Sequence, residues 1–437
     1  MKYRYLFTVL LAVCLLPASR AAAADLSTLI RADYEGKADS LEYCFVENFL
    51  NKSKGIFWAV PKDNSDRENA TRYIYWQQAH AMDVIIYAYE RLMEEERTTE
   101  AAAYKTFITR WFNNHAGNYA GSTWTNPYTD DMAWIGLTIV HIGEAFGTER
   151  FYTAAKTVYK NIASRQKTND TGLYLPWNTD EGAGPNACTL APSALLAIKL
   201  YELFGTDSYL EDAIAYCDYL IDSGITKSDG RVEEPPLTYT QGTLGEAMRR
   251  LYHITGKTDY KNKAGLYINY AFTSGRCTSK GLLRHEGTSM DQSIFKAVLI
   301  PYAVNFVLDE DMLLTRRRST MKYLQDNADA LWKNLDLDRY PQTYCPYYWG
   351  ETFDYSTTPS MGAMTSGASL LEGVTRMNRK VLEATAVRPV VMEDAQNDTR
   401  NTGNTGNANV AYYLAGQQVD PDTKGFLIIN GRKCFNP

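Results

Sequence analysis

Two adjacent aspartates, Asp130 and Asp131, stand just before an apolar segment in the stretch NPYTDDMAWIGL. Cleavage of a glycosidic bond with retention uses two carboxyl groups about 5–5.5 Å apart, one as nucleophile and one as proton donor. Neighbouring helical side chains leave the backbone about 100° apart, so this pair could reach two sides of one bond. A helix N-terminus favours an anion, and repulsion between the two raises the pKa of the second carboxyl.

Aspartate is also common at helix starts because its side chain accepts hydrogen bonds from free backbone amides. For an isolated Asp-Asp pair, capping is the more frequent role. Here the pair follows an aromatic-rich loop, precedes Trp134 by one turn, and belongs to a set of similar loop-to-helix junctions. This context favours a chemical role.

The junctions recur along the chain. Several open with a polar cluster, continue into an apolar helix, turn at glycine and enter an amphipathic helix. The starts are Trp76, Asp130, Asn186, Thr240, Met290 and Thr358. A spacing of about 50 to 70 residues indicates repeated supersecondary units.

The first segment of each unit is apolar on nearly all sides, as in MAWIGLTIVHIGEAF, whereas the second has one apolar stripe, as in YTAAKTVYKNIAS. A helix that is apolar all round is buried, and one with a stripe covers it. Six such units predict an all-α fold, an (α/α)6 toroid of six helical hairpins; an open solenoid is the alternative. The parallel inner helices would bring their N-termini and the loops before them together in one cleft.

Polar and aromatic residues at these helix starts and loops are candidates for holding a sugar. The predicted substrate-binding residues are Trp124, Tyr128, Trp177, Asn186, Tyr239, Gln241, Asp291 and Lys296. Each has a structural alternative: a helix cap for Asn186 and Asp291, a buried hydrogen bond for Gln241, and an ion pair with Asp291 for Lys296. Core packing is the expected role of Trp134 and of His80.

Several segments together resemble glycoside hydrolase family 76, the α-1,6-mannanases. They are WQQAHAMDVIIYAYERL, YTDDMAWIGL, NACTLAPSALLAIKLYELFGTDSYL, TYTQGTLGEAMRRLYHITG and MDQSIFKAVLIPY. The likeness runs from about residue 40 to 375. Met290 and Ala297 depart from it, because the family usually has glycine at both positions.

The resemblance implies that Asp130 is the nucleophile and Asp131 the acid/base of a retaining, endo-acting α-1,6-mannanase. It implies an α-mannan polysaccharide or oligosaccharide as substrate and no cofactor or metal. Three alternatives stay open: a transglycosidase, another (α/α)6 carbohydrate enzyme, and a non-catalytic glycan-binding protein.

The first 24 residues read as a signal peptide, with a basic start, an apolar run and small residues before the expected cleavage site. We expect export to the periplasm or cell surface of a Gram-negative-type bacterium; lipidation at Cys14 is the second interpretation. No later segment is expected to span a membrane. The net charge of −6 without a basic stripe disfavours nucleic acid as a partner.

The mature chain is expected to comprise the hydrolase domain at 25–377, a low-complexity linker at 378–409 and a β-hairpin tail at 410–437. Six cysteines follow the signal segment without a CxxC or Cys/His pattern. The spacing therefore indicates no metal site, and no disulfide is predicted.

Overall fold

The computed structural model describes residues 21–31, 34–72, 74–115 and 124–385, together with the backbone of short strands between 411 and 436. The predicted signal segment therefore lies largely outside the described residues. The chain divides into two compact units, one formed by residues 31–377 and the other by the two chain ends.

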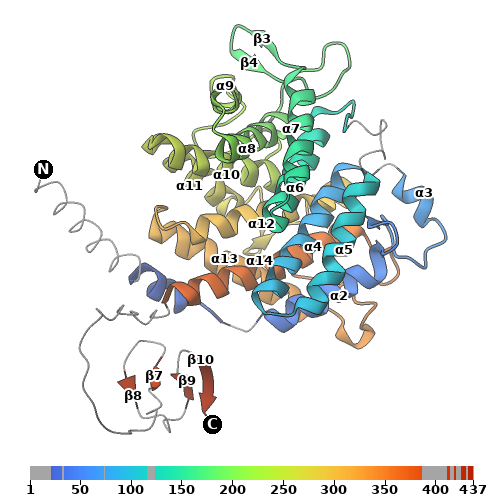
Figure 1. Cartoon of the computed structure of the whole chain (residues 1–437), viewed down its shortest axis with the longest axis vertical. Coiled ribbons are helices and arrows are strands. Elements are labelled where there is room, and N and C mark those ends of the chain that lie inside the picture. Colours follow the sequence, from blue (N-terminus) through green and yellow to red (C-terminus); the bar gives the residue numbers. More distant parts are fainter. Residues whose placement is uncertain are drawn as a thin grey trace, which may run out of the picture. The chain divides into compact units, whose positions relative to one another are not determined.

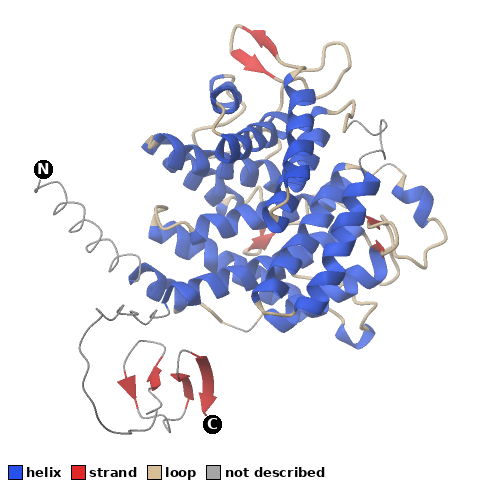
Figure 2. Cartoon of the chain, in the orientation of Figure 1, coloured by secondary structure: helices blue, strands red, loops and turns tan. Residues whose placement is uncertain are grey.

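Residues 31–377 fold as pairs of helices, and strands are few and short (Figures 1 and 2). The inner helices are α4 (Trp76–Glu94), α6 (Thr129–Phe146), α8 (Ala187–Phe204), α10 (Thr238–Thr255), α12 (Met290–Leu308) and α14 (Met361–Thr385). The outer helices are α5 (Thr98–His115), α7 (Glu149–Ala163), α9 (Asp207–Asp222), α11 (Thr258–Thr273), α13 (Leu314–Asn334) and α2 (Glu35–Phe49). The all-α prediction of a six-hairpin toroid is confirmed.

The loops of this ring contain short strands and short helices. Three antiparallel ribbons are formed by β1 (Leu50–Asn51) with β2 (Ile56–Phe57), β3 (Lys167–Asn169) with β4 (Gly172–Tyr174), and β5 (Thr278–Ser279) with β6 (Leu282–Leu283). The short helices are α3 (Arg67–Thr71) and the 3-10 turn η1 (Leu337–Arg339).

Burial separates inner from outer helices as the apolar patterns predict. Nearly every residue of α6 from Asp131 to Gly143 is buried. The outer helix α7 buries a single stripe, which consists of Phe151, Ala155, Val158, Tyr159 and Ile162. This spacing follows the helical period, so one face packs on the inner ring and the other faces solvent.

Glycine ends three of the inner helices. Gly147, Gly205 and Gly256 follow α6, α8 and α10 with φ angles of 61°, 65° and 70°. Glycine adopts this left-handed conformation without the steric cost that a Cβ atom would bring. Each turn therefore sends the chain directly into its outer helix, as predicted.

The last inner helix closes the ring between α12 and α4. The Ser366 hydroxyl donates to the Ser293 carbonyl of α12 at 2.8 Å. On the other side, the Arg91 guanidinium of α4 donates twice to the Glu372 carboxylate, both at 2.8 Å. A buried, bidentate ion pair of this kind fixes the two helices in one register.

The outer partner of this last inner helix comes from the start of the domain. Asp39 of α2 pairs with Arg97 beside α5 at 2.7 Å, and Tyr34 just before α2 donates to Asp329 of α13. The six-hairpin prediction implies a second helix after the segment that begins at Thr358, whereas the sixth outer helix is α2. The ring is completed by a helix that precedes the first repeat.

Helix α8 is long and apolar enough, by length and composition, to span a membrane. The expectation that no segment after the signal peptide reaches that length is therefore wrong. The reason is its place in the ring, where an inner helix is surrounded by other helices and 67% of it is buried in the protein.

The unit formed by the chain ends contains a four-stranded antiparallel sheet in the order β10-β9-β7-β8. Its strands are β7 (Ala411–Tyr413), β8 (Gln418–Val419), β9 (Gly425–Ile429) and β10 (Arg432–Asn436). Strands β9 and β10 form a hairpin, β7 pairs with β9, and β8 pairs with β7. The hairpin read from the sequence instead joined the runs on either side of the DPDTKG turn. The linker predicted at 378–409 begins too early, because residues 378–385 are the last turns of α14; its remainder, from 386 to 409, lies outside the described residues.

Candidate active site

The N-terminal ends of five inner helices surround a pocket of about 370 Å³. Its lining residues come from α4, α6, α8, α10, α12 and the loops before them: Tyr75, Trp76, Gln77, Tyr128, Asp130, Asp131, Trp134, Trp177, Cys188, Tyr239, Asp291 and Phe295. Parallel inner helices thus place one cleft at their shared end, as the sequence pattern indicates.

Asp130 and Asp131 lie in the first turn of α6 and both line the pocket. Oδ2 of Asp130 accepts a hydrogen bond from the Trp177 indole nitrogen at 3.2 Å and one from the Cys188 thiol at 3.5 Å. Oδ2 of Asp131 accepts from the Asn126 side-chain amide at 2.9 Å. The N-cap residue of α6, Tyr128, makes no capping hydrogen bond with its side chain.

Hydrogen bonds from neighbouring segments hold the loop before α6 in place. The Arg165 guanidinium, just beyond α7, donates to the carbonyls of Asn126 and Pro127 at 2.6 and 2.9 Å. The Thr129 amide donates to the Trp177 carbonyl at 2.8 Å, which ties this loop to the one before α8. These bonds fix the direction from which the two aspartates enter the pocket.

The surroundings of the two carboxyls raise their pKa values by different amounts. Burial raises the pKa of Asp130 to about 6, and the donors Trp177 and Cys188 act in the opposite direction. Burial, followed by the charge of Asp130, raises the pKa of Asp131 well above its usual range, and Asn126 partly offsets this. Asp130 is thus the carboxyl that ionises first, and Asp131 is the one that holds its proton more firmly.

Aromatic rings that line the pocket pack against one another. Phe295 stacks with Tyr239 at a ring-centroid distance of 4.2 Å and with Trp76 at 6.2 Å. Trp134 is only 2% exposed and lies 5.0 Å from the ring of His80. Both residues are packed in the core, although an edge of Trp134 reaches the pocket.

Four of the predicted substrate-binding residues line this pocket: Tyr128, Trp177, Tyr239 and Asp291. Trp177 is 42% exposed and packs against Tyr128 at 5.3 Å, so an aromatic pair forms the rim. Asp291 accepts a hydrogen bond from Gln77, which links the starts of α12 and α4.

Two other predicted binding residues have structural partners. Asn186 caps α8, because its side-chain oxygen accepts from the Thr189 amide at 2.9 Å. Gln241 is fully buried and bonds the backbone of the preceding loop, accepting from Val232 N at 2.8 Å and donating to Gly230 O at 3.0 Å. Asn186 is thus a helix cap and Gln241 makes buried structural hydrogen bonds, which are the structural alternatives given for them, and neither lines the pocket.

The remaining two predicted residues also lie away from the pocket. Lys296 is 3% exposed, donates to the Tyr347 carbonyl at 2.6 Å and lies 3.9 Å over the ring of Trp349. The Lys296 ammonium therefore contacts a backbone carbonyl and an aromatic ring, and it does not form the expected ion pair with Asp291. Trp124 is 7% exposed and packs on Phe112 at 5.3 Å.

Five lining residues were not among the predicted binding residues: Tyr75, Trp76, Gln77, Cys188 and Phe295. Three of them stand at the start of α4, where WQQAHA opens the first repeat. The rule applied to the other helix starts would have found them. Cys188 lies two residues after Asn186, at a helix start where the sequence already predicted a binding residue.

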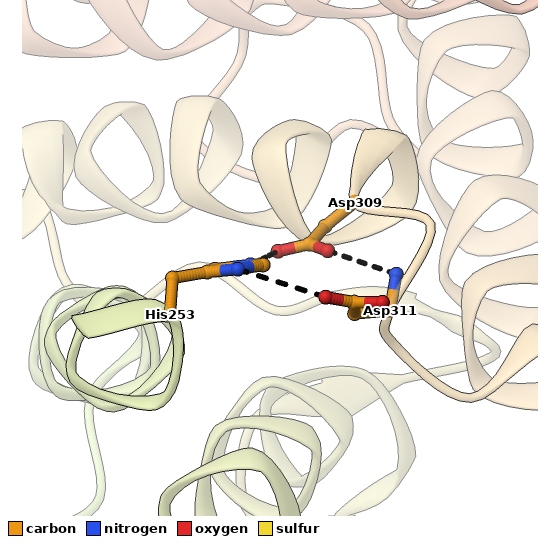
Figure 3. Close-up of side chains that lie close together, drawn as sticks. All are labelled: His253, Asp309 and Asp311. Atoms are coloured by element: carbon orange, nitrogen blue, oxygen red, sulfur yellow. Dashed lines mark hydrogen bonds and ion pairs between the residues drawn. The ribbon is translucent and has the colours of Figure 1, made fainter. Parts of the chain in front are cut away.

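A separate group of side chains joins the C-terminal ends of α10 and α12 (Figure 3). His253 Nε2 lies 2.6 Å from Asp309 Oδ2, and His253 Nδ1 lies 3.7 Å from Asp311 Oδ2. The guanidinium of Arg249 also contacts Asp309 Oδ2 at 2.7 Å. A cation already occupies this carboxylate, so the cluster is an ion-pair network that joins the two helices.

Comparison with solved structures finds the same architecture in carbohydrate enzymes. The α-1,6-mannanase GH76A of Salegentibacter sp. HEL1_6 is 23% identical with a TM-score of 0.70, covering 79% of this chain and all of that one. That structure is an inactive variant, with two consecutive aspartates replaced by alanine, in complex with α-1,6-mannotetrose.

Two further structures share the fold at lower identity. A family 76 glycoside hydrolase (mannosidase) from Bacteroides thetaiotaomicron is 17% identical, covers 80% of this chain and 99% of that one, and has a TM-score of 0.63. Dfg5 from Chaetomium thermophilum, in complex with glucosamine, is 16% identical, covers 82% and 92%, and has a TM-score of 0.59.

No curated protein sequence matches the chain. The model of Glycosyl hydrolase family 76 matches residues 34–384, which span the entire ring from just before α2 to the end of α14. The chain belongs to glycosyl hydrolase family 76.

Proposed function

We propose that this protein is a retaining, endo-acting α-1,6-mannanase in which Asp130 is the nucleophile and Asp131 the acid/base. One observation carries the proposal: two adjacent carboxyls line one pocket, and their surroundings favour an ionised Asp130 beside a protonated Asp131. Carboxyls in opposite protonation states are what a double-displacement hydrolysis requires.

In the first step, the Asp130 carboxylate attacks the anomeric carbon and forms a covalent ester with the sugar. The bond from that carbon to the glycosidic oxygen breaks, and Asp131 transfers its proton to this oxygen. The shortened chain leaves as an alcohol. Because the departing oxygen never has to carry a full negative charge, the barrier falls.

In the second step, Asp131 acts as a base. Its carboxylate removes a proton from a water molecule, the water oxygen attacks the anomeric carbon, and Asp130 is released as a carboxylate. Two inversions at one carbon retain its configuration. A second sugar hydroxyl in place of water would give transglycosylation by the same route.

The relatives support the choice of substrate. The Salegentibacter enzyme is an α-1,6-mannanase bound to α-1,6-mannotetrose, and its inactive form lacks two consecutive aspartates, the arrangement that Asp130 and Asp131 have here. The aromatic rim of Trp177 and Tyr128 suits sugar rings, because a flat apolar face can stack on the ring while polar edges bond its hydroxyls.

Export belongs to the same proposal. Mannan is a large polysaccharide, so an enzyme that cleaves it within the chain must meet it outside the cytoplasm. The basic start, apolar run and small residues of the first 24 positions support secretion to the periplasm or cell surface. Fractionation of cells expressing the full-length chain, followed by N-terminal sequencing of the exported product, tests this part.

Digestion of debranched α-1,6-mannan tests the catalytic proposal. The wild type is expected to release reducing ends and a ladder of oligosaccharides, whereas Asp130→Ala and Asp131→Ala lose this activity with folding intact. Asp207→Asn, in the first turn of the outer helix α9, is the matched control and should stay fully active. Full activity in either of the two active-site variants refutes the roles assigned here.

Two readouts separate the alternatives. Proton NMR during the reaction shows the anomeric configuration of the first product, and retention is expected. Added mannose-based acceptors reveal how much of the glycosyl-enzyme goes to a sugar instead of water. Tight mannan binding by the wild type without any turnover would favour the glycan-binding alternative.

A further inference from the structure

Asp130 is held by two donors from different parts of the chain. The Trp177 indole comes from the loop that follows β4, and the Cys188 thiol comes from the first turn of α8. Both hydrogen bonds end on the same oxygen, Oδ2. The other oxygen, Oδ1, is buried without a hydrogen-bond partner among the described residues. One side of the carboxylate is therefore anchored and the other is not.

The position of Trp177 is set by its own backbone. Its amide donates to the Gly184 carbonyl at 3.0 Å, and its carbonyl accepts from the Thr129 amide at 2.8 Å. The second bond reaches the residue directly before Asp130. The indole donor and the carboxylate it contacts are therefore tied together through the backbone as well as through the side chains.

The Cys188 side chain has the chemistry of a donor here. A thiol carries one proton, and Sγ lies 3.5 Å from Asp130 and 3.2 Å from the Asn186 side-chain oxygen. When Asp130 is ionised, its carboxylate is the stronger of these two acceptors. Burial and the nearby charge of Asp130 raise the pKa of this thiol well above its usual range, so it stays protonated. A thiolate beside Asp130 would instead repel the charge that the proposed nucleophile needs.

We propose that Cys188 and Trp177 are positioning residues, which together orient the Asp130 carboxylate and keep it ionised for attack on the sugar. The inference rests on the proposed role of Asp130 as nucleophile. It assigns a function to a partly exposed cysteine that lines the pocket, and a second function to a tryptophan at the pocket rim.

The expected effects follow from hydrogen bonding to a charged group. Loss of the indole donor in Trp177→Phe should lower kcat roughly tenfold and move the acidic limb of kcat/KM upward by about one pH unit. Cys188→Ala should act in the same direction with a smaller effect, because a thiol is a weak donor. Cys188→Ser, which keeps a donor, should fall between alanine and the wild type.

Matched controls separate positioning from general damage. Cys217→Ala removes a fully buried thiol from the outer helix α9. Trp58→Phe removes an indole bond of the same kind, to Glu68 at 3.1 Å, outside the pocket. Both variants should keep the kcat and the pH profile of the wild type. A purely structural role for Cys188 and Trp177 would lower the folded fraction without moving the acidic limb.

A second readout needs no substrate. Protein labelled with ¹³C at the aspartate carboxyl carbon, with the Asp130 resonance assigned from Asp130→Asn, reports the titration of this group directly. The Asp130 midpoint should rise in Trp177→Phe and in Cys188→Ala and stay unchanged in the two controls. An unchanged midpoint in both variants overturns the positioning roles.

The two readouts keep the two proposals distinguishable. A wild type that cleaves mannan, with acidic limbs unmoved in both variants, overturns the positioning inference and leaves the mannanase proposal standing. A wild type that leaves mannan intact contradicts the mannanase proposal, and the carboxyl titration still decides whether Cys188 and Trp177 control the charge of Asp130.

Discussion

Replacing Asp130 by asparagine should stabilise the folded protein while abolishing its activity. Burial raises the pKa of Asp130 to about 6, above the ordinary value of 3.8. Between these two pH values the folded chain binds more protons than the unfolded chain, so stability falls as pH rises through this window and stays lower above it. A difference of about 2 pH units at about 1.4 kcal/mol each gives a cost of about 3 kcal/mol at pH 7.

Asparagine avoids this cost but gives up two hydrogen bonds to a charged acceptor, which offsets part of the gain. We expect a net stabilisation of about 1–3 kcal/mol at pH 7, which for a domain of this size corresponds to an increase in Tm of about 1–4 °C. The gain should disappear near pH 4, where the wild-type carboxyl is protonated as well.

Thermal and urea denaturation of the wild type and Asp130→Asn, at pH 7 and pH 4, measures the effect. Asp207→Asn is the control, because it replaces an aspartate in the first turn of an outer helix outside the pocket. A variant no more stable than the wild type at pH 7, or a gap of equal size at both pH values, would refute the reasoning that burial strains the ionised Asp130.

Three further predictions concern pH and packing. The acidic limb of kcat/KM should have its midpoint near pH 6, because Asp130 must be ionised to attack; a midpoint near pH 4 contradicts this. Glu372→Gln should cost about 3 kcal/mol in chemical denaturation, because the buried Arg91 loses its bidentate partner; a loss below about 1 kcal/mol, the value of a surface pair, argues against it. Gly242→Ala should cost about 1–3 kcal/mol, because the new Cβ atom would meet a Cα atom of α12 at 2.9 Å; unchanged stability would show that the helices separate freely.

The sequence predicts the ring well because each of its features is local. Apolar residues on nearly all sides mark the inner helices, a single apolar stripe marks the outer ones, and the glycines at 147, 205 and 256 mark where three inner helices end. Parallel inner helices then require a common N-terminal face, which brings Asp130 and Tyr239 to one pocket although more than one hundred residues separate them. None of these steps needs a side-chain contact.

Contacts within the site could not be predicted in the same way. A position near a helix start determines at which end of the ring a residue lies. It does not determine where the side chain points, because this direction turns by about 100° from one residue to the next. Gln241 therefore bonds the loop behind it, and Lys296 turns toward Trp349. The bond from Trp177 to Asp130 depends on how a long loop folds, which no local pattern encodes.

The sixth outer helix illustrates a different limit. Helix α2 lies at the start of the domain, and its partner α14 lies at the end, so no repeat in the sequence pairs them. The ion pairs of Asp39 and the hydrogen bond of Tyr34 become visible only once the ring has closed.

Trapping of the glycosyl-enzyme tests the central claim most directly. A fluorinated mannosyl donor that reacts quickly but hydrolyses slowly should leave a covalent adduct, and peptide mass spectrometry should locate it on Asp130. Asp131→Asn should still form the adduct when the leaving group is fluoride, which needs little protonation, and Asp130→Asn should form none. An adduct on another residue, or rapid turnover of the donor with inversion and no adduct, would contradict the account.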